Sequence, residues 1–325
     1  MKTFNEISEI ITNRLEQINW NMHPKGLYQP IDYVLSMGGK RIRPVLTLLA
    51  CNLFTDDIEP AIDPALGIEI FHNFTLLHDD IMDRADVRRG KMTVHKKWND
   101  NTAILSGDVM QITAYKYIAN APAMQLKQTL DLFSKTAAEI CEGQQYDVEF
   151  ENQDDVLAEQ YLEMIRLKTA VLLGCALQIG AWIGGADNKT AQLLYDFGIN
   201  VGLAFQLKDD LLDVYGNEES FGKKIGGDIL CNKKTYLLIH ALKLAKNETA
   251  NDLENWLKNS DPSQENEKIA GVTAIFDKLG VKDICENKMQ EYGNKAIGLL
   301  DEVEIENDKK QELRNLADKL LYRKD

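Results

Sequence analysis

The sequence predicts an all-α protein. Apolar residues recur at steps of three and four over long stretches, which is the period of a helix face. Strand-like alternation bounded by turn signals is hard to find, and proline is scarce, at seven residues in 325. The chain shows no internal repeat and no linker rich in serine or proline, so we expect a single domain over residues 1–325.

Composition and charge narrow the function. A hydrophobic content of 44% is enough for a large core. The formal net charge of −14 argues against nucleic acid as a partner, because a phosphate backbone needs clustered positive charge. Five scattered cysteines have no paired spacing, so they indicate free thiols in a reducing compartment and no zinc site.

The beginning of the chain is polar and lacks the apolar core of a signal peptide. No uninterrupted apolar run is long enough to span a bilayer. We therefore expect a soluble, cytoplasmic protein without a membrane span.

Helices can be placed in chain order. Pro44 reads as the first turn of a helix that follows the stretch GGKRIRP. Asp63 has the character of an N-cap and Pro64 of a first helical residue, before a helix that runs to the aspartates of LLHDDIMD. Residues 155–185 read as one long helix, apolar all round after Lys168 and ended by two glycines, and residues 188–216 as another.

Two acidic clusters are embedded in apolar helix. The first comprises Asp79, Asp80 and Asp83, and the second comprises Asp209, Asp210 and Asp213. One such cluster is more often a solvated acidic face, but two within apolar segments are hard to explain in that way. Buried carboxylates need a cation, and oxygen ligands without His or Cys nearby favour magnesium. Substrate phosphates would complete its coordination shell. Gln206 lies one turn before Asp210 on the same face.

Basic residues occur at separate points of the chain. Each basic patch alone would be interpreted as exposed charge that keeps the protein soluble. Beside two acidic clusters, the basic patches together indicate a diphosphate site. A glycine pair followed by cations at a helix start is typical of an anion cradle. The cations are Lys40, Arg41 and Arg43, then Arg88 and Arg89, then Lys223, Lys224, Lys233 and Lys234. Lys168 interrupts an apolar helix, so it needs an anionic partner.

These motifs carry a family resemblance. In order they are GGKRIRP, LLHDDIMD, RRG, EGQQYD, LKT, FQLKDDLLD, GKKIGGDI and KKT, between about Gly38 and Thr235. The chain resembles the trans-isoprenyl diphosphate synthases of the polyprenyl synthetase family. The resemblance implies the isoprenoid synthase fold, a bundle of mostly antiparallel helices around a deep cavity, as a homodimer.

The resemblance also implies the reaction and the site. Isopentenyl diphosphate would condense with an allylic diphosphate, with both aspartate clusters holding magnesium, three ions in all. Arg88, Lys168, Lys223 and Lys233 match contacts to the allylic diphosphate, and Lys40, Arg43, His72 and Arg89 match the isopentenyl diphosphate pocket. Thr169 and Gln206 match polar groups near the allylic carbon, and Gln144 and Asp147 match a motif lining the site. His72 alone would be read as a core histidine.

The resemblance predicts a short product, with geranylgeranyl diphosphate first and farnesyl diphosphate as the alternative. Asp80 and Asp83 lack the two-residue insertion of typical bacterial farnesyl synthases between them. We expect the prenyl tail to run along the helix that carries Asp79, so that Thr75 and Phe71, one and two turns before Asp79, limit the chain length. Phe74 matches a chain-length position that is aromatic in short-chain members. The plainer interpretation is that both phenylalanines belong to the core.

Other interpretations of the chain are a terpene cyclase and a non-catalytic regulatory subunit. A cyclase carries a different second metal motif, and a regulatory subunit would have lost aspartates. A purely structural bundle would not explain the ordered basic motifs. Chain elongation therefore fits the sequence best.

Overall fold

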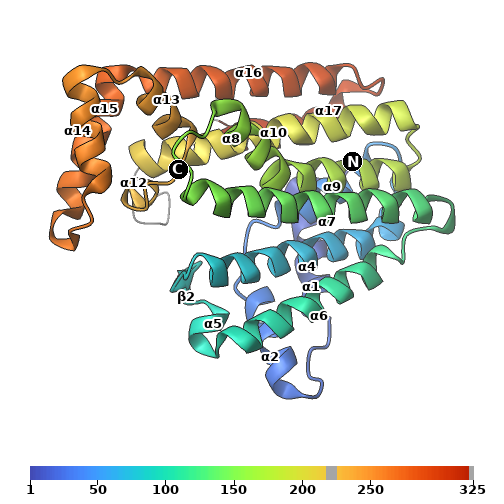
Figure 1. Cartoon of the computed structure of the whole chain (residues 1–325). Helices are drawn as coiled ribbons and strands as arrows, with labels where there is room; N and C mark the ends of the chain where they lie inside the picture. The colour runs from blue at the N-terminus through green and yellow to red at the C-terminus, as the bar shows by residue number, and fades with distance from the viewer. Residues whose placement is uncertain (217–224, 322–325) are drawn as a thin grey trace. The chain divides into compact units, whose positions relative to one another are not determined.

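Helices make up nearly all of the regular structure. The computed structural model describes residues 1–216 and 225–321 (Figure 1). Its first helices are α1 Phe4–Glu16, α2 Lys25–Leu35, α3 Ile42–Asn52, α4 Glu59–Met82, α5 Val94–Lys97, α6 Asp100–Ile118 and α7 Ala123–Glu151. They are followed by α8 Ala158–Ile165, the π-helix η1 Arg166–Ala170, α9 Val171–Gly184, α10 Asn188–Tyr215, α12 Gly227–Leu230 and α13 Tyr236–Leu244. The last are α14 Asn247–Lys258, the 3₁₀ turn η2 Pro262–Gln264, α15 Glu265–Leu279, α16 Val281–Asp301 and α17 Asn307–Leu321.

The chain divides into two compact units. The first contains residues 1–135, 172–195 and 303–313, and the second contains residues 136–171, 196–302 and 314–325. The two aspartate clusters fall in different units, Asp79–Asp83 in the first and Asp209–Asp213 in the second. The single domain over residues 1–325 stays a prediction.

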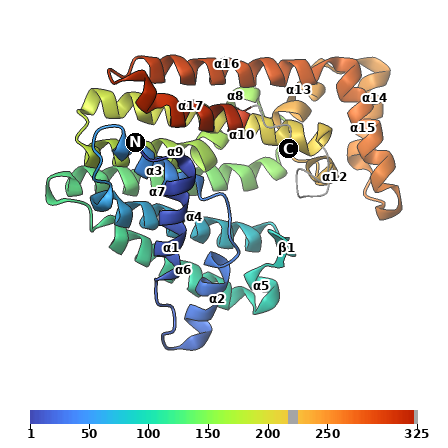
Figure 2. The same ribbon diagram turned by 180° about the vertical axis from the view of Figure 1, so that it is seen from behind.

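The first unit is built around α4. This helix is apolar on nearly every side, so neighbours must cover it all round. It packs against α6 and α3, and α1 crosses beside α3 and α4 (Figure 2). Because α4 is enclosed for most of its length, its last turn with Asp79 and Asp80 is held in one place.

The predicted start of α4 is wrong. The helix begins at Glu59, with Pro60 in its first turn, and Pro64 lies inside it. Ile58, Ala61 and Ile62 are at most 5% exposed, so their burial favours one more helical turn. That gain overrides the missing hydrogen bond at Pro64 and its clash with the preceding turn.

A small hairpin is the one sheet among the described residues. Val87–Arg88 (β1) pairs antiparallel with Lys91–Met92 (β2), so the turn between them carries Arg89 and Gly90. The sequence did not predict these strands, because two-residue strands leave no periodic pattern. The hairpin matters because it presents both predicted arginines.

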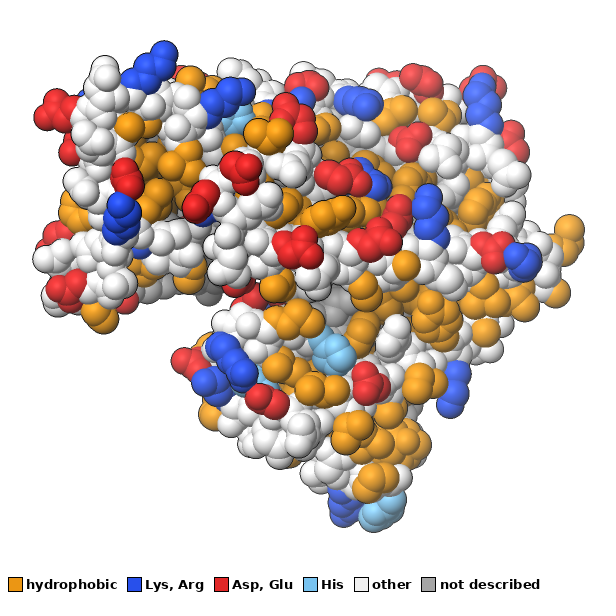
Figure 3. All heavy atoms as spheres, viewed as in Figure 1, with side chains coloured by type: hydrophobic (Ala, Val, Ile, Leu, Met, Phe, Trp, Pro, Cys, Tyr) orange, Lys and Arg blue, Asp and Glu red, His pale blue; other side chains and the backbone are white. Residues whose placement is uncertain are grey.

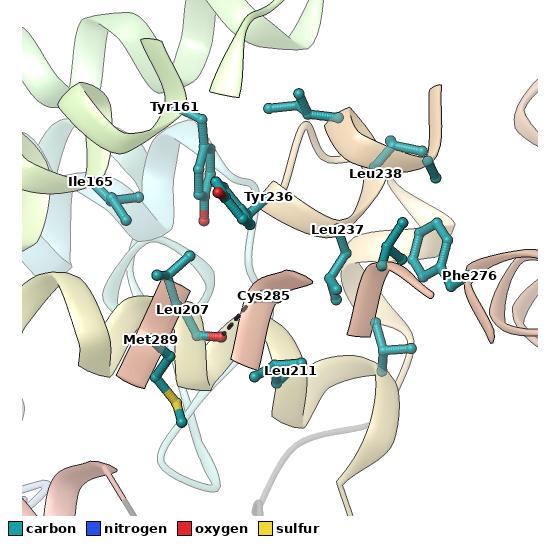
Figure 4. Close-up of a cluster of buried hydrophobic side chains, with 14 of the residues drawn as sticks. Tyr161, Ile165, Leu207, Leu211, Tyr236, Leu237, Leu238, Phe276, Cys285 and Met289 are labelled. Atoms are coloured by element: carbon teal, nitrogen blue, oxygen red, sulfur yellow. Dashed lines mark hydrogen bonds between the residues drawn. The ribbon is translucent and has the colours of Figure 1, made fainter. Parts of the chain in front are cut away.

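The second unit has its own hydrophobic core (Figure 4). Residues of α10, α13, α15 and α16 meet there, with Tyr161 entering from α8. Leu237 and Cys285 are fully buried, and the Cys285 thiol approaches the Leu207 carbonyl at 3.7 Å. The core therefore holds the segment of α10 that carries the second aspartate cluster.

The stretch predicted as one helix over residues 155–185 is helical from Ala158 to Gly184 but changes its winding. Five residues, Arg166–Ala170, form a π-turn between α8 and α9. Ala158–Gly184 is long and apolar enough to cross a membrane by length and composition, and 78% of its most apolar window is buried in the structure. Such burial is typical of a core helix.

Candidate functional site

The first aspartate cluster lies at the C-terminal end of α4. Arg88 Nε donates to Asp80 Oδ1 at 2.7 Å, and its guanidinium approaches Asp79 Oδ2 at 3.5 Å. Asp83 is the exposed C-cap of the helix. The hairpin thus brings one cation to two of the three carboxylates.

Asp80 is 5% exposed. Burial raises the pKa of its carboxyl to about 6, Arg88 opposes that change, and the charges of Asp79 and Asp83 add to it. Because burial is the largest cause of the shift, a cation bound beside Asp80 would stabilise its charged form.

The hairpin is tied to two distant segments. The Tyr33 hydroxyl on α2 donates to the Met92 carbonyl at 2.9 Å. Arg89 donates to the Gly38 carbonyl in the stretch GGKRIRP. Gly39 has a φ of +141°, and a Cβ there would lie 2.9 Å from the Arg89 guanidinium. The glycine pair therefore makes room for an arginine that comes from fifty residues further along the chain.

Arg43 and His72 are brought together. Arg43 Nη1 donates to His72 Nε2 at 3.0 Å. Burial lowers the pKa of His72 well below its ordinary range, and four nearby arginines add to that effect, so the imidazole is neutral. Burial also lowers the pKa of Arg43 to about 10, which leaves it charged at neutral pH. Among the described residues, the buried Arg43 Nε has no hydrogen-bond acceptor.

Two members of the GGKRIRP stretch differ in their surroundings. Lys40 is exposed, as an anion cradle would require. Arg41 is 8% exposed and its guanidinium is bound to Glu69, so the expectation that Arg41 lines an anion cradle is wrong. The Glu69 carboxylate supplies the counter-charge that a buried guanidinium needs.

The predicted chain-length residues lie in an aromatic cluster. Phe71 is fully buried, and its ring is 5.4 Å from Phe74 and 5.1 Å from Phe133 on α7. Phe74 meets the His78 ring edge-on at 4.7 Å. The Thr75 hydroxyl donates to the His72 carbonyl at 2.8 Å and so stays within the helix.

The second aspartate cluster is also partly satisfied by neighbours. The Tyr161 hydroxyl donates to Asp210 Oδ2, and Gln206 Nε2 approaches Asp210 Oδ1 at 3.5 Å. The Thr169 hydroxyl donates to Gln206 at 3.3 Å. The predicted shared face of Gln206 and Asp210 is therefore confirmed, and Thr169 joins it.

Burial raises the pKa of Asp210 to about 8, and the charge of Asp228 adds to the effect. Tyr161, Lys233 and Gln206 act in the opposite direction. The carboxyl thus holds a proton at neutral pH until a cation replaces it. Asp213 accepts a hydrogen bond from the Asp228 backbone at 3.1 Å, whereas Asp209 is half-buried.

Lys168 has the anionic partner that its apolar surroundings require. Its Nζ donates to Asp147 Oδ2 at 2.6 Å, and Lys233 Nζ lies 3.7 Å from the same oxygen. Burial acts to raise the pKa of Asp147, but Lys233 and Lys168 outweigh that effect. The pKa of the carboxyl is therefore below its ordinary value, and Asp147 stays charged. Gln144 is half-buried one turn before Asp147.

The π-turn positions Lys168 and Thr169. Gly143 on α7 lies so close that a Cβ there would be 2.3 Å from the Lys168 backbone nitrogen. π-Bulges inside α-helices occur frequently at functional sites. The close approach therefore fixes the backbone that carries two predicted site residues. Lys223 and Lys224 lie outside the described residues.

The carboxylates fit magnesium better than a metal held by protein alone. Among residues 1–216 and 225–321, no group of three or more His, Cys, Asp and Glu side chains is arranged to hold a metal ion. Magnesium typically takes one or two carboxylates, water and substrate phosphates. Asp80 and Asp210 suit such a site, because burial raises the pKa of both carboxyls and a bound cation would stabilise their charged forms.

Comparison with known proteins decides the family. The polyprenyl synthetase family model matches residues 24–275. The chain belongs to the polyprenyl synthetase family. Its relatives include the geranylgeranyl pyrophosphate synthase of Geoglobus acetivorans, which is 37% identical over 318 residues covering 97% of both chains. The geranylfarnesyl diphosphate synthase of Natronomonas pharaonis is 36% identical and is aligned over 98% of this chain and 96% of its own.

Solved structures of polyprenyl synthetases match equally well. A geranylgeranyl pyrophosphate synthase has a TM-score of 0.94 at 44% identity over all of both chains. The geranylgeranyl pyrophosphate synthetase of Pyrococcus horikoshii has a TM-score of 0.91 at 33% identity over 98% of both chains. The predictions of an all-α isoprenoid synthase fold and of a prenyltransferase are confirmed.

Several contributing residues were missed from the sequence. Tyr161 binds Asp210, Asp228 adds to its charge environment, and Glu69 binds Arg41. Tyr161 is an isolated aromatic on an amphipathic helix, so its pattern is that of an ordinary core residue. Glu69, an acidic residue inside the apolar run of α4, was the one visible signal, by the same logic that selected Lys168.

Asp210→Asn should flatten the dependence of stability on pH. The pKa of Asp210 rises from 3.8 to about 8 on folding, so the folded state holds the proton more tightly than the unfolded state. The stability that this group supplies is present at low pH and is lost as the pH rises through about 8. Urea unfolding followed by circular dichroism from pH 5 to 9, in EDTA, should show the wild type losing more stability than Asp210→Asn.

The matched control for this prediction is Asp187→Asn. Asp187 is exposed, and a hydrogen bond from Thr190 lowers its pKa, so its proton is already absent across this range. A wild-type profile as flat as that of Asp210→Asn would contradict the assigned pKa.

Proposed function

We propose that the chain condenses isopentenyl diphosphate with an allylic diphosphate, namely dimethylallyl, geranyl or farnesyl diphosphate, to give all-trans geranylgeranyl diphosphate. The observation that carries the proposal is the charge arrangement of the first unit. Arg88 binds the first aspartate cluster, while Arg43, His72 and Arg89 gather beside the stretch GGKRIRP. A reaction between two diphosphates requires two separate sets of cationic side chains, one for each diphosphate.

The carboxylates of both clusters would hold magnesium, with three ions as the predicted number. Ions held there would supply positive charge to offset the negative charge that develops on the departing diphosphate. Arg88, Lys168 and Lys233 would bind the oxygens of the allylic diphosphate and stabilise the same charge as the carbon–oxygen bond ionises. Asp147 pairs with both lysines in the absence of substrate, so their ammonium groups are already positioned beside an anion when a diphosphate enters.

Lys40, Arg43, His72 and Arg89 would hold isopentenyl diphosphate. The neutral His72 can donate to a phosphate oxygen without adding charge, and the buried Arg43 Nε offers a further donor. The double bond of isopentenyl diphosphate then attacks the allylic cation, and a proton passes to the released diphosphate. Apolar walls must exclude water, which would quench the cation.

The test is incubation with magnesium, isopentenyl diphosphate and each allylic primer in turn, followed by product identification. Geranylgeranyl diphosphate as the main product supports the proposal. Farnesyl diphosphate would favour the alternative, and a cyclic hydrocarbon would favour a terpene cyclase. No turnover with any primer would contradict the proposal. We propose a cytoplasmic location, which fractionation of cells would test.

Arg89→Ala should raise the KM for isopentenyl diphosphate, whereas Lys233→Ala should raise the KM for the allylic substrate. Each change removes one charge-assisted phosphate contact, worth about 1.5–3 kcal/mol, or roughly ten- to a hundredfold. Steady-state kinetics with each substrate varied separately measures both. The reverse pattern would mean that the two pockets are exchanged.

Phe71→Ala, Phe74→Ala and the double variant should lengthen the product. At about 1.5 Å per residue, Phe71 lies roughly 12 Å before Asp79 along α4, deep enough to stop a growing prenyl chain. Product chromatography should show additional five-carbon units. Because removing a buried phenylalanine costs about 3–5 kcal/mol, Phe197→Ala in the second unit serves as the control for lost stability. Unchanged length in all three active variants would show that α4 does not set the product.

A homodimer is also proposed, formed through α6. Ile104, Leu105 and Ile112 are 42%, 56% and 58% exposed on this helix, and hydrophobic side chains gather on the face of the first unit seen in Figure 3. An apolar helix face of this kind is suited to the same face on a second copy.

Replacing both Leu105 and Ile112 with lysine should give a monomer in sedimentation velocity. The two side chains are exposed within the chain, so the circular dichroism spectrum should not change. Leu242→Lys on α13, 40% exposed, is the control and should sediment as the wild type does. A dimer that survives both lysines would place the interface elsewhere.

A further inference from the structure

Arg41 turns inward from the basic stretch in which it lies. Its backbone is left-handed, with a φ of 47°, and its guanidinium makes two hydrogen bonds. Nη1 donates to Glu69 Oε1 and Nη2 donates to the Leu35 carbonyl, both at 2.6 Å. A non-glycine residue in this backbone region is uncommon and needs surrounding contacts to hold it.

Glu69 has a second donor on its own helix. Asn73 Nδ2 donates to Glu69 Oε1 and to the Glu69 carbonyl, each at 2.8 Å. Glu69 and Asn73 are both 1% exposed. Among the described residues, Asn73 Oδ1 has no hydrogen-bond donor, so this amide is oriented at the cost of one unsatisfied oxygen. We name Arg41, Glu69 and Asn73 the buried triad.

Stability alone does not account for the buried triad. Desolvating a buried ion pair costs about as much as the attraction returns, and apolar residues of similar volume are often equal or better. The helix around Glu69 is otherwise apolar, so an apolar side chain would fit the pattern of α4. The position of the triad suggests another role.

The triad adjoins every predicted member of the isopentenyl diphosphate pocket. Lys40 precedes Arg41 in the chain, and Arg43 follows it by two residues. His72 lies three residues after Glu69 on α4, at the spacing of neighbours on one helix face. The negative charge of Glu69 favours the charged forms of both Arg43 and Arg89.

We propose that the buried triad is a positioning device for the isopentenyl diphosphate pocket. The Arg41–Glu69 pair fixes the left-handed turn, so that Lys40 faces solvent while Arg43 reaches His72. Glu69 also supplies the buried counter-charge that lets Arg43 and Arg89 lie close together without substrate. None of the three residues needs to touch the substrate. This inference rests on the proposed function of that pocket.

The test compares two kinds of variant. Glu69→Gln removes the charge and keeps the shape. The double variant Arg41→Met with Glu69→Leu removes the whole ion pair and leaves apolar side chains. For each we would measure the melting temperature, kcat, the KM for each substrate, and binding of isopentenyl diphosphate alone by calorimetry.

Glu69→Gln should raise both the KM and the calorimetric Kd for isopentenyl diphosphate at least tenfold. The KM for the allylic substrate should change less than about threefold. The double variant should regain the wild-type melting temperature while isopentenyl diphosphate stays weakly bound. Glu59→Gln is the matched control, because Glu59 is exposed on the same helix and paired with Arg14 at 2.7 Å. It should leave every quantity unchanged.

Three outcomes would overturn the inference. The first is wild-type affinity for isopentenyl diphosphate in the double variant. The second is wild-type affinity for it in Glu69→Gln. The third is an equal loss of affinity for both substrates in Glu69→Gln. If the ion-pair variants do not fold, Asn73→Leu decides, since it removes only one donor to Glu69: selective weakening of isopentenyl diphosphate supports positioning, and no change contradicts it. A wild type that binds isopentenyl diphosphate but forms no product would contradict the proposed function. The inference on the triad would then be tested by the calorimetric Kd values alone.

Discussion

Pairing of buried charges is the constraint on which the rest of the structure depends. Buried or half-buried charged side chains in both units are paired with a long side chain of opposite charge from a separate segment. Arg88 reaches the first cluster from the hairpin, Lys168 reaches Asp147 from the π-turn, and Arg41 reaches Glu69 from the end of a glycine pair. The helices provide positions, but these pairs decide which side chains remain outward for a ligand.

The pairing is incomplete in a way that suits a magnesium-dependent enzyme. Asp80 keeps a raised pKa in spite of Arg88, and Asp210 keeps a still higher one in spite of Tyr161 and Lys233. Full pairing would make the fold more stable but would leave less affinity for a metal and its diphosphate. Burial of these two carboxyls costs stability, which is common at functional sites.

Much of the fold and the chemistry could be predicted because both follow short-range patterns. The period of three to four gave α10 Asn188–Tyr215 almost to the residue, and the apolar setting of Lys168 correctly required an anion. Tertiary contacts decided the rest. Burial of Ile58 and Ile62 moved the start of α4, and Glu69 drew Arg41 inward. The second case shows the limit of counting cations in a motif, because the consecutive residues Lys40 and Arg41 face opposite environments.

The π-turn was the least predictable element, and a close backbone contact adjoins it. Nothing in the sequence around Lys168 departs from a good α-helix, so propensity gives no signal for an extra residue in the turn. The signal lies on another helix, where Gly143 removes the Cβ that would meet the Lys168 nitrogen. Without that gap α7 could not approach the turn, and Asp147, one turn further along α7, would lie further from Lys168. The glycine, the π-turn and the ion pair therefore act together, and a substitution at any one should be felt at the other two.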